Sequence, residues 1–234
     1  LEVETPTVVD TLVDVPLGPP MEGPSGEDLP GAEGDIGGIA DALRGTGDGL
    51  NTGTGLGAGG AGGGAASFFG VEARGSRFAY IVDVSGSMRG EPLAVLKVEL
   101  IESIQALLEH MAFYVSFFSS DAFGIGGRTK WIDASDEGKK FAFAEIGRVE
   151  AQGGTNPLPG FEMVFRMKPR PDAIYFMTDG QFDPSVVNDI ARLNASGKKV
   201  VIHCITFLDN SAEPMMREIA QQSGGTYHHI RGPR

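Results

Sequence analysis

Residues 78–87, FAYIVDVSGS, form the stretch of sequence that decides the fold. Residues 78–82 are apolar at successive positions, which is typical of a strand covered on both faces, as in the centre of a parallel sheet. Asp83 follows this run, and Ser85 and Ser87 come after it at alternate positions. Because alternate residues of an extended chain project to the same side, we expect these three oxygen-bearing side chains to converge at the carboxyl end of a central strand.

Downstream of this strand, helical periods alternate with short apolar runs. After Pro92, apolar residues recur at steps of three and four through Leu93, Leu96, Leu100, Ile104, Leu107 and Met111, which predicts one long amphipathic helix. Further strands are predicted at 113–118, 130–132, 173–177, 200–207 and 227–230, and further helices at 136–149, 157–165, 184–194 and 212–223. This order predicts an α/β fold with a doubly wound, mostly parallel sheet and helices on both faces.

Residues 1–66 differ in composition from the rest of the 234-residue chain. They contain 18 of the 35 glycines and 6 of the 14 prolines, and their charge of 1 − 11 = −10 makes up most of the net −12. Such a segment buries too little apolar area to offset its ordering entropy. The composition predicts a disordered, flexible acidic linker at 1–66, in which only residues 8–15 favour an extended strand, and a folded domain at 67–234.

The charge balance of the remaining residues argues against nucleic acid as a partner. They carry 31 − 11 = 20 acidic and 19 − 1 = 18 basic side chains, a net charge of −2. No basic surface large enough to neutralise a phosphate backbone is expected. The single cysteine, Cys204, excludes an internal disulfide framework and a cysteine-based zinc cluster.

The sequence contains no apolar run of about 18 residues and no signal-peptide pattern, so no transmembrane segment is predicted in it. The chain begins with Leu1 rather than methionine. We therefore expect a segment upstream of Leu1, in which any membrane anchor would lie, and this favours a location in the cell envelope.

Two further side chains would reach the edge of the sheet where Asp83 lies if the elements that carry them are neighbours of its strand. Thr155 belongs to the loop Gly153-Gly154-Thr155-Asn156, and Asp179 follows the predicted strand at 173–177. Ligands of doubly wound sheets bind beyond the carboxyl ends of the strands, where the direction of winding switches. With Asp83, Ser85 and Ser87, these residues make five candidate ligands, all of them oxygens.

These motifs together resemble the metal-ion-dependent adhesion site of von Willebrand factor type A (vWA) domains. The resemblance rests on Asp-x-Ser-x-Ser at 83–87, the Gly-Gly-Thr-Asn loop at 153–156 and the Thr-Asp-Gly turn at 178–180, and it covers about residues 68–234. It implies a Rossmann-like vWA fold. It also implies that Mg²⁺, or else Mn²⁺ or Ca²⁺, is held by Asp83, Ser85, Ser87, Thr155 and Asp179, directly or through water.

In this family a partner protein supplies the last metal ligand, so the resemblance implies a protein partner that presents an Asp or Glu carboxylate. The donor chemistry agrees, because Mg²⁺ prefers about six hard oxygen ligands and tends to keep waters. Two carboxylates balance its charge, and hydroxyls fill further positions without adding negative charge. We therefore expect a metal-dependent adhesion or assembly module, not an enzyme.

Two alternatives stay open at this point. A phosphotransferase of the haloacid-dehalogenase type also places an aspartate after a central strand and uses Mg²⁺, but it requires a second carboxylate where Ser85 stands. The metal could also be purely structural, in a scaffold that binds partners elsewhere. A nearby stretch at 117–121, FFSSD, could line the rim of the site, although a strand end turning into a polar loop is the simpler interpretation.

Overall fold

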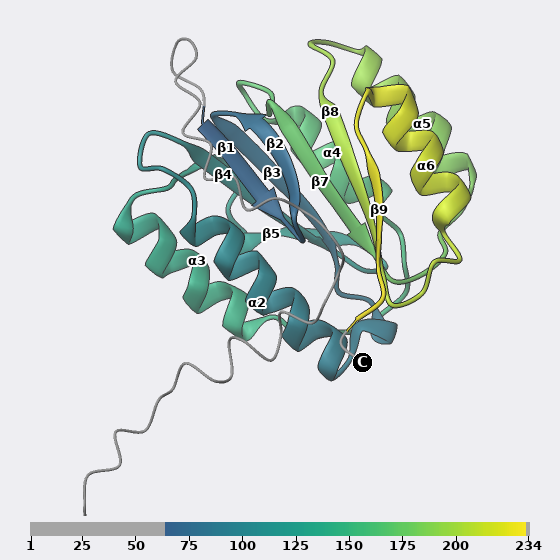
Figure 1. The fold of residues 1–234 in the computed structure, drawn as a ribbon, viewed down its shortest axis with the longest axis horizontal. Helices are drawn as coiled ribbons and strands as arrows, with labels where there is room; N and C mark the ends of the chain where they lie inside the picture. The colour runs from purple at the N-terminus through teal and green to yellow at the C-terminus, as the bar shows by residue number, and fades with distance from the viewer. Residues whose placement is uncertain (1–63, 233–234) are drawn as a thin grey trace, which may run out of the picture. The chain divides into compact units, whose positions relative to one another are not determined.

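The main sheet has seven strands in the part of the chain that the computed structural model describes, residues 64–232. Five of them are parallel: β3 (Arg77–Asp83), β4 (Ala112–Phe118), β7 (Ala173–Thr178), β8 (Val201–Phe207) and β9 (Tyr227–Ile230). The short strands β5 (Ala122–Gly124) and β6 (Ile132–Asp133) pair antiparallel with β4. The spatial order is β5-β4-β3-β7-β8-β9 (Figure 1).

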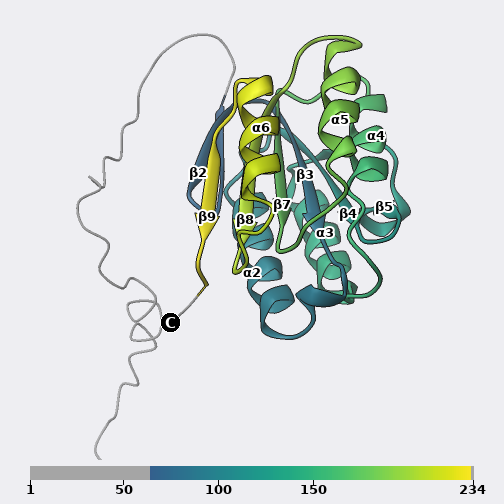
Figure 2. The ribbon, with the colours of Figure 1, turned by 90° about the vertical axis from the view of Figure 1, so that its right-hand side faces the viewer.

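Helices cover both faces of this sheet, which confirms the predicted doubly wound α/β fold. On one face lie α2 (Glu91–Gln105) and α3 (Asp136–Arg148), and on the other lie α4 (Leu158–Arg166), α5 (Ser185–Ala195) and α6 (Glu213–Ser223) (Figures 1 and 2). Each face therefore has its own apolar core. Among the described residues, no helix combines the length and the apolar character that crossing a membrane requires.

The direction of winding reverses between β3 and β7. From β3 the chain passes through α2 to β4 on one side, whereas β7, β8 and β9 follow one another on the other side. In the parallel register Phe78 is opposite Ala173 and Val82 is opposite Met177, so β3 and β7 end at the same level. The carboxyl ends of these two strands form the point where sheets of this kind bind ligands.

A β-hairpin precedes the sheet, and the sequence analysis did not predict it. It consists of β1 (Gly64–Phe68) and β2 (Val71–Gly75), so β1 begins inside the segment that was predicted to be a linker. The hairpin packs on the face of the sheet that α2 also covers: the Phe68 ring contacts those of Tyr80 and Tyr175, and the Tyr175 hydroxyl donates to the Ala66 carbonyl at 2.6 Å. The rest of the predicted linker, residues 1–63, lies outside the described residues.

The prediction of one helix that reaches Met111 was wrong. Helix α2 ends at Gln105, although Leu107 and Met111 are buried as its apolar spacing suggested. Two tight turns, closed by Leu107 N–H to the Ile104 carbonyl and by Met111 N–H to the Leu108 carbonyl, carry these side chains into the core. The edge strand predicted at 130–132 is also displaced, since β6 begins at Ile132.

Asp172 ties together the amino ends of three parallel strands. One carboxylate oxygen accepts hydrogen bonds from the Ser76 and Arg77 backbone N–H groups at 2.9 and 3.1 Å, and the other accepts one from Lys198 Nζ at 2.9 Å. Burial raises the pKa of Asp172, but the hydrogen bonds from Ser76, Lys198 and Arg77 outweigh it and lower the pKa to about 2. The carboxylate therefore stabilises the fold in its ionised form.

We expect Asp172→Ala to lower the free energy of unfolding at pH 7 by about 1–3 kcal/mol, because the bonded N–H groups lose a charged acceptor. The folded-state pKa of Asp172 lies below its ordinary value of 3.8. Its contribution is therefore fully present above pH 4 and is lost as the pH falls toward about 2. Urea unfolding of the protein and the variant from pH 7 to pH 2 should show the two curves converging over that interval.

Asp133→Ala is the matched control, since Asp133 is exposed and its side chain makes no hydrogen bond or ion pair with the described residues. Its effect should stay within about 0.5 kcal/mol at every pH. A stability difference between Asp172→Ala and the unaltered protein that is unchanged at pH 2 would contradict the assignment.

Candidate metal centre

The structure brings the predicted side chains to the rim where β3 and β7 end. Asp83 is the last residue of β3, and Ser85 and Ser87 follow in a turn that contains the short 3₁₀ helix Gly86–Met88. Asp179 directly follows β7, and Thr155 lies in the loop between α3 and α4. The candidates thus come from three segments far apart in the sequence.

The Asp83 carboxylate is fully buried and held from two sides. One oxygen accepts a hydrogen bond from the Ser85 backbone N–H at 2.7 Å, and the other accepts one from the Thr178 hydroxyl at 2.6 Å. Thr178 is the last residue of β7, so this second bond crosses between the paired strands. The orientation of the carboxylate is therefore fixed at both of its oxygens.

Serine hydroxyls connect the two strand ends. The Ser87 hydroxyl donates to an Asp179 carboxylate oxygen at 2.8 Å, and the Ser85 and Ser87 hydroxyl oxygens are 3.0 Å apart. Ser85 is 1% exposed, whereas Ser87 is exposed to solvent. The cluster therefore extends from the buried Asp83 to the surface, and a ligand can approach it from that side.

Hydrogen bonds to neighbouring segments hold the loop that carries Thr155. Gly86 N–H donates to the Gly153 carbonyl at 3.0 Å, and Gly154 N–H donates to the Ser120 hydroxyl at 2.8 Å. Gly153 has a φ of +80°, which favours glycine at this position. Thr155 lies close to the turn that carries Asp179. Its hydroxyl oxygen is 3.7 Å from the position that a β-carbon would occupy on Gly180, the residue after Asp179.

Helix α4 follows this loop and packs unusually close to the sheet. A β-carbon on Gly160 would lie 3.1 Å from Ile81 Cγ2 and 3.2 Å from Ser116 Oγ, which is tighter than side chains normally pack. The absence of a side chain at Gly160 therefore allows α4, and with it the end of the Thr155 loop, to lie against β3 and β4.

The two carboxylates carry negative charge that is not paired with a basic side chain of the described residues. Burial raises the pKa of Asp83 to about 6, against the lowering effect of its hydrogen bonds from Ser85 and Thr178. Burial also raises the pKa of Asp179, and the nearby charge of Asp209 adds to this rise. Neither Asp83 nor Asp179 forms an ion pair with a Lys, Arg or His in residues 64–232. A bound cation would supply the missing positive charge.

The donor set fits a hard divalent cation. Carboxylate and hydroxyl oxygens are the ligands that Mg²⁺ prefers. The described part of the chain holds no group of three or more His, Cys, Asp or Glu side chains that could bind a metal. The side chains around Asp83 provide hydroxyl oxygens in addition to two carboxylates, and these can serve as further ligands.

Sequence reasoning missed the support that three residues give to this cluster. It recognised Thr178 only as part of a motif, whereas the Thr178 hydroxyl binds the Asp83 carboxylate. It treated Ser119 and Ser120 as an ordinary polar loop, yet the Ser120 hydroxyl and the Ser119 carbonyl accept hydrogen bonds from Gly154 and Asn156 of the Thr155 loop. The polar residues directly after β4 could have indicated this support. Strand β4 is the neighbour of β3, so its carboxyl end lies beside Asp83.

The histidines and the cysteine take no part in the cluster. His203 on β8 is 9% exposed, its Nδ1 lies 2.9 Å from the Thr226 hydroxyl, and its ring packs beside Tyr175. His229 Nδ1 lies 2.9 Å from the Thr206 hydroxyl. Cys204 is fully buried in the core between the sheet and α6. These contacts belong to packing within and beside the sheet.

Known structures resemble this chain in fold. A von Willebrand factor type A protein from Catenulispora acidiphila matches with a TM-score of 0.61 and 20% identity over 70% of this chain and 41% of that one. An aerotolerance-related membrane protein from Bacteroides fragilis matches with a TM-score of 0.53 and 20% identity over 68% and 92%. A D319A mutant of the PilB minor pilin from Streptococcus sanguinis has a TM-score of 0.53 and 12% identity over 67% and 57%.

At these identities the likeness concerns the fold alone, and this chain spans less than half of the Catenulispora acidiphila chain. The sequence itself matches the family model for the von Willebrand factor type A domain over residues 77–229, which is more than half of the chain. That match runs from the start of β3 almost to the end of β9 and includes all five candidate ligands. This chain therefore belongs to the von Willebrand factor type A domain family.

Proposed function

We propose that this domain is a metal-dependent protein-binding module for adhesion or assembly. Mg²⁺, held by Asp83, Ser85, Ser87, Thr155 and Asp179, would accept a carboxylate from an Asp or Glu of a partner protein. Domains of this family are typically protein-binding modules, which agrees with this role. In this proposal the domain recognises its partner by coordination and performs no chemical reaction.

One observation carries the proposal: two buried carboxylates at neighbouring strand ends have no basic partner among the described residues and lie beside an exposed rim. Asp83 accepts a hydrogen bond from the Ser85 backbone N–H, and Asp179 accepts one from the Ser87 hydroxyl. Leaving a buried charge uncompensated is costly. A divalent cation at this point would balance both aspartates. Ser87, at the exposed end of the cluster, lies where an incoming carboxylate would arrive.

The five ligands would have two different roles, charge neutralisation and coordination. Asp83 and Asp179 would neutralise the cation, while Ser85, Ser87 and Thr155 would bind without adding negative charge. Such a metal keeps its affinity for one more anionic ligand. The Thr178 and Ser120 hydroxyls would orient the ligands through the hydrogen bonds that they make to Asp83 and Gly154.

We expect Asp83→Asn to weaken Mg²⁺ binding by more than about 100-fold, because even the loss of a group that only orients a ligand costs 10–100-fold. The amide is isosteric and keeps an acceptor oxygen, so the fold should be retained. Calorimetric titration with Mg²⁺ gives the affinity, and far-UV circular dichroism checks the fold.

Asp183→Asn is the matched control for local charge, since Asp183 lies near Asp179 in sequence but is exposed, and its carboxylate accepts a hydrogen bond from the Ser185 N–H at the start of α5. It should change the Mg²⁺ affinity little. If both variants weaken binding equally, the affinity reflects diffuse negative potential and not coordination.

The partner's carboxylate is tested with a peptide that contains a single Glu. At saturating Mg²⁺ the peptide should bind, and its Glu→Gln version, a chelator, or Asp83→Asn should each abolish binding. Mg²⁺ uptake without a response to the carboxylate would instead support a structural metal. Hydrolysis of a phosphomonoester that Asp83→Asn abolishes would favour the phosphotransferase.

We expect Ser120→Ala to weaken Mg²⁺ binding by about tenfold, because Gly154 loses the acceptor that holds the Thr155 loop. Ser119→Ala is its matched control, since Ser119 contacts the same loop through its backbone carbonyl, which the substitution keeps. Ser119→Ala should bind Mg²⁺ like the unaltered protein. Equal affinities for all three proteins in a calorimetric titration would show that the Ser120 hydroxyl does not position the loop.

A further inference from the structure

A cavity of about 440 Å³ lies at the amino ends of β3, β7 and β8, which are neighbouring parallel strands. Its lining comes from the first residue of β3 and from the loops that precede β7 and β8. Four of the lining residues are basic: Arg77, Lys168, Arg170 and Lys198. Because Asp83 and Asp179 lie at the carboxyl ends of β3 and β7, this cavity is at the opposite end of the sheet from the candidate metal centre.

Positive charge at this cavity exceeds negative charge. None of the residues that line it is acidic. Among the described residues, the carboxylate that pairs with the four basic side chains is Asp172, which lies 2.9 Å from Lys198 Nζ and 3.8 Å from an Arg77 guanidinium nitrogen. Lys168 forms no ion pair within residues 64–232. The cavity therefore has a net charge of 4 − 1 = +3, although residues 67–234 have a net charge of −2.

Neutral groups hold the Arg170 guanidinium, so its charge is not neutralised. Its two terminal nitrogens donate to three backbone carbonyls of residues 193–198 and to the Ser196 hydroxyl, over distances of 2.8–3.2 Å. The guanidinium also lies against Gly197, where a β-carbon would be 2.9 Å from Arg170 Cζ. Arg170 is therefore already held in position beside the cavity without a charged partner.

The Arg77 guanidinium has a buried donor without a partner. Its Nε is shielded from solvent, and none of the described residues accepts a hydrogen bond from it. Leaving a buried donor of a charged group unsatisfied is unfavourable. Since Arg77 lines the cavity, an anion bound there would be a suitable acceptor for this donor.

We propose that this cavity binds a diphosphate group, either free or as part of a larger small-molecule ligand. Guanidinium and ammonium groups, which the cavity supplies, are the side-chain groups that bind phosphate oxygens best. The net charge of +3 matches a multiply charged anion better than a monovalent one. A volume of about 150 Å³ already holds benzene, so this cavity has room for two linked phosphate groups. Its size is also within the range of small-ligand sites.

The test uses the full chain with inorganic pyrophosphate as the probe, in about 0.15 M NaCl, which screens diffuse attraction, and without divalent cations. Pyrophosphate then has no metal through which to bind at Asp83, so the result does not depend on the proposed function. Trp131 is the single tryptophan, and its indole N–H donates at 2.9 Å to the carbonyl of Pro169, which lines the cavity. In nitrogen-15 NMR, the Trp131 indole and the Arg77 Nε–H resonances should shift saturably. Absent or non-saturable shifts overturn the proposal.

Two variants each remove one positive charge from the cavity. Arg77→Gln should weaken pyrophosphate binding by about tenfold or more, because it removes a charged hydrogen-bond donor. Lys168→Gln should weaken it by about two- to fivefold, the range for an exposed ion pair. Calorimetric titration gives the affinities, and urea unfolding checks that each variant is folded. An unchanged affinity in either folded variant contradicts the assigned site.

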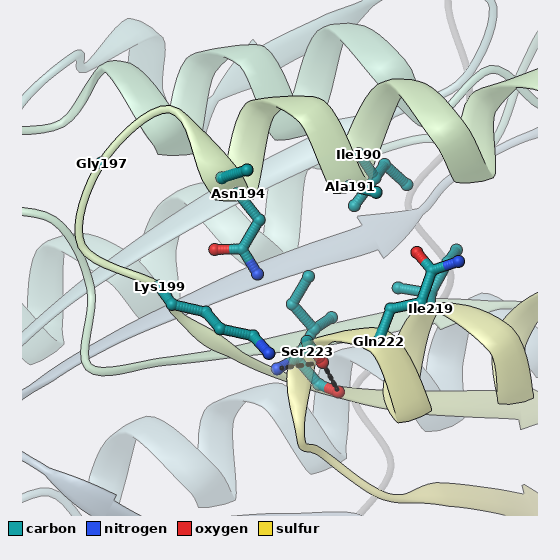
Figure 3. Close-up of a pocket in the computed structure, with 10 residues that line it drawn as sticks. Ile190, Ala191, Asn194, Gly197, Lys199, Ile219, Gln222 and Ser223 are labelled. Atoms are coloured by element: carbon teal, nitrogen blue, oxygen red, sulfur yellow. Dashed lines mark hydrogen bonds between the residues drawn. The ribbon is translucent and has the colours of Figure 1, made fainter.

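Lys199→Gln is the matched control for charge, because Lys199 directly follows Lys198 but does not line this cavity. Figure 3 shows its side chain extending from the loop after α5 toward Ser223 on α6. The variant should bind pyrophosphate like the unaltered protein. A loss equal to that of Lys168→Gln would mean that pyrophosphate responds only to net charge, which overturns the proposal.

Two further anions distinguish the possible sources of the diphosphate group. Methyl diphosphate that binds as tightly as pyrophosphate would support a larger ligand that carries the group, and weaker binding would support the free anion. Orthophosphate should bind more weakly than pyrophosphate, because it reaches fewer of the basic side chains. Equal affinities for orthophosphate and pyrophosphate would contradict a diphosphate site.

Discussion

The parallel pairing of β3 with β7 is the constraint on which the candidate site depends. The register of these strands puts Asp83 beside Thr178 and leaves Asp179 just beyond the same edge. Because the chain winds away from this point in both directions, none of the crossover helices between the described strands covers it. A shift of β7 by one residue would turn Thr178 to the other face of the sheet and remove the bond that orients Asp83.

Most of the fold and three of the five candidate ligands could be predicted from the sequence because they follow from a short periodicity. The apolar run at 78–82 fixes a central strand, and the alternate positions of Asp83, Ser85 and Ser87 place three oxygens on one side of it. The bond between Ser87 and Asp179 could not be derived in this way, because it depends on which strands are neighbours. Only the likeness to a family supplied that adjacency.

Other features escaped sequence reasoning for identifiable physical reasons. The spacing of Leu107 and Met111 continues that of α2, but tight turns place apolar side chains in the core as well as a helix does. The hairpin begins in a Gly- and Ala-rich stretch that carries little strand signal, and it is stabilised by the aromatic contacts of Phe68. The support that Ser120 gives to Gly154 involves a backbone amide, which no side-chain pattern reveals.

The close approach of α4 at Gly160 means that residues which would not touch a ligand can still affect ligand binding. Any larger residue there must displace Ile81 or Ser116, or push the helix outward together with the end of the Thr155 loop. In a saturation mutagenesis screen for partner binding, large residues at codon 160 would therefore be selected against together with changes at the codons for the ligands. A position that does not tolerate substitution in such a screen therefore need not contact the partner.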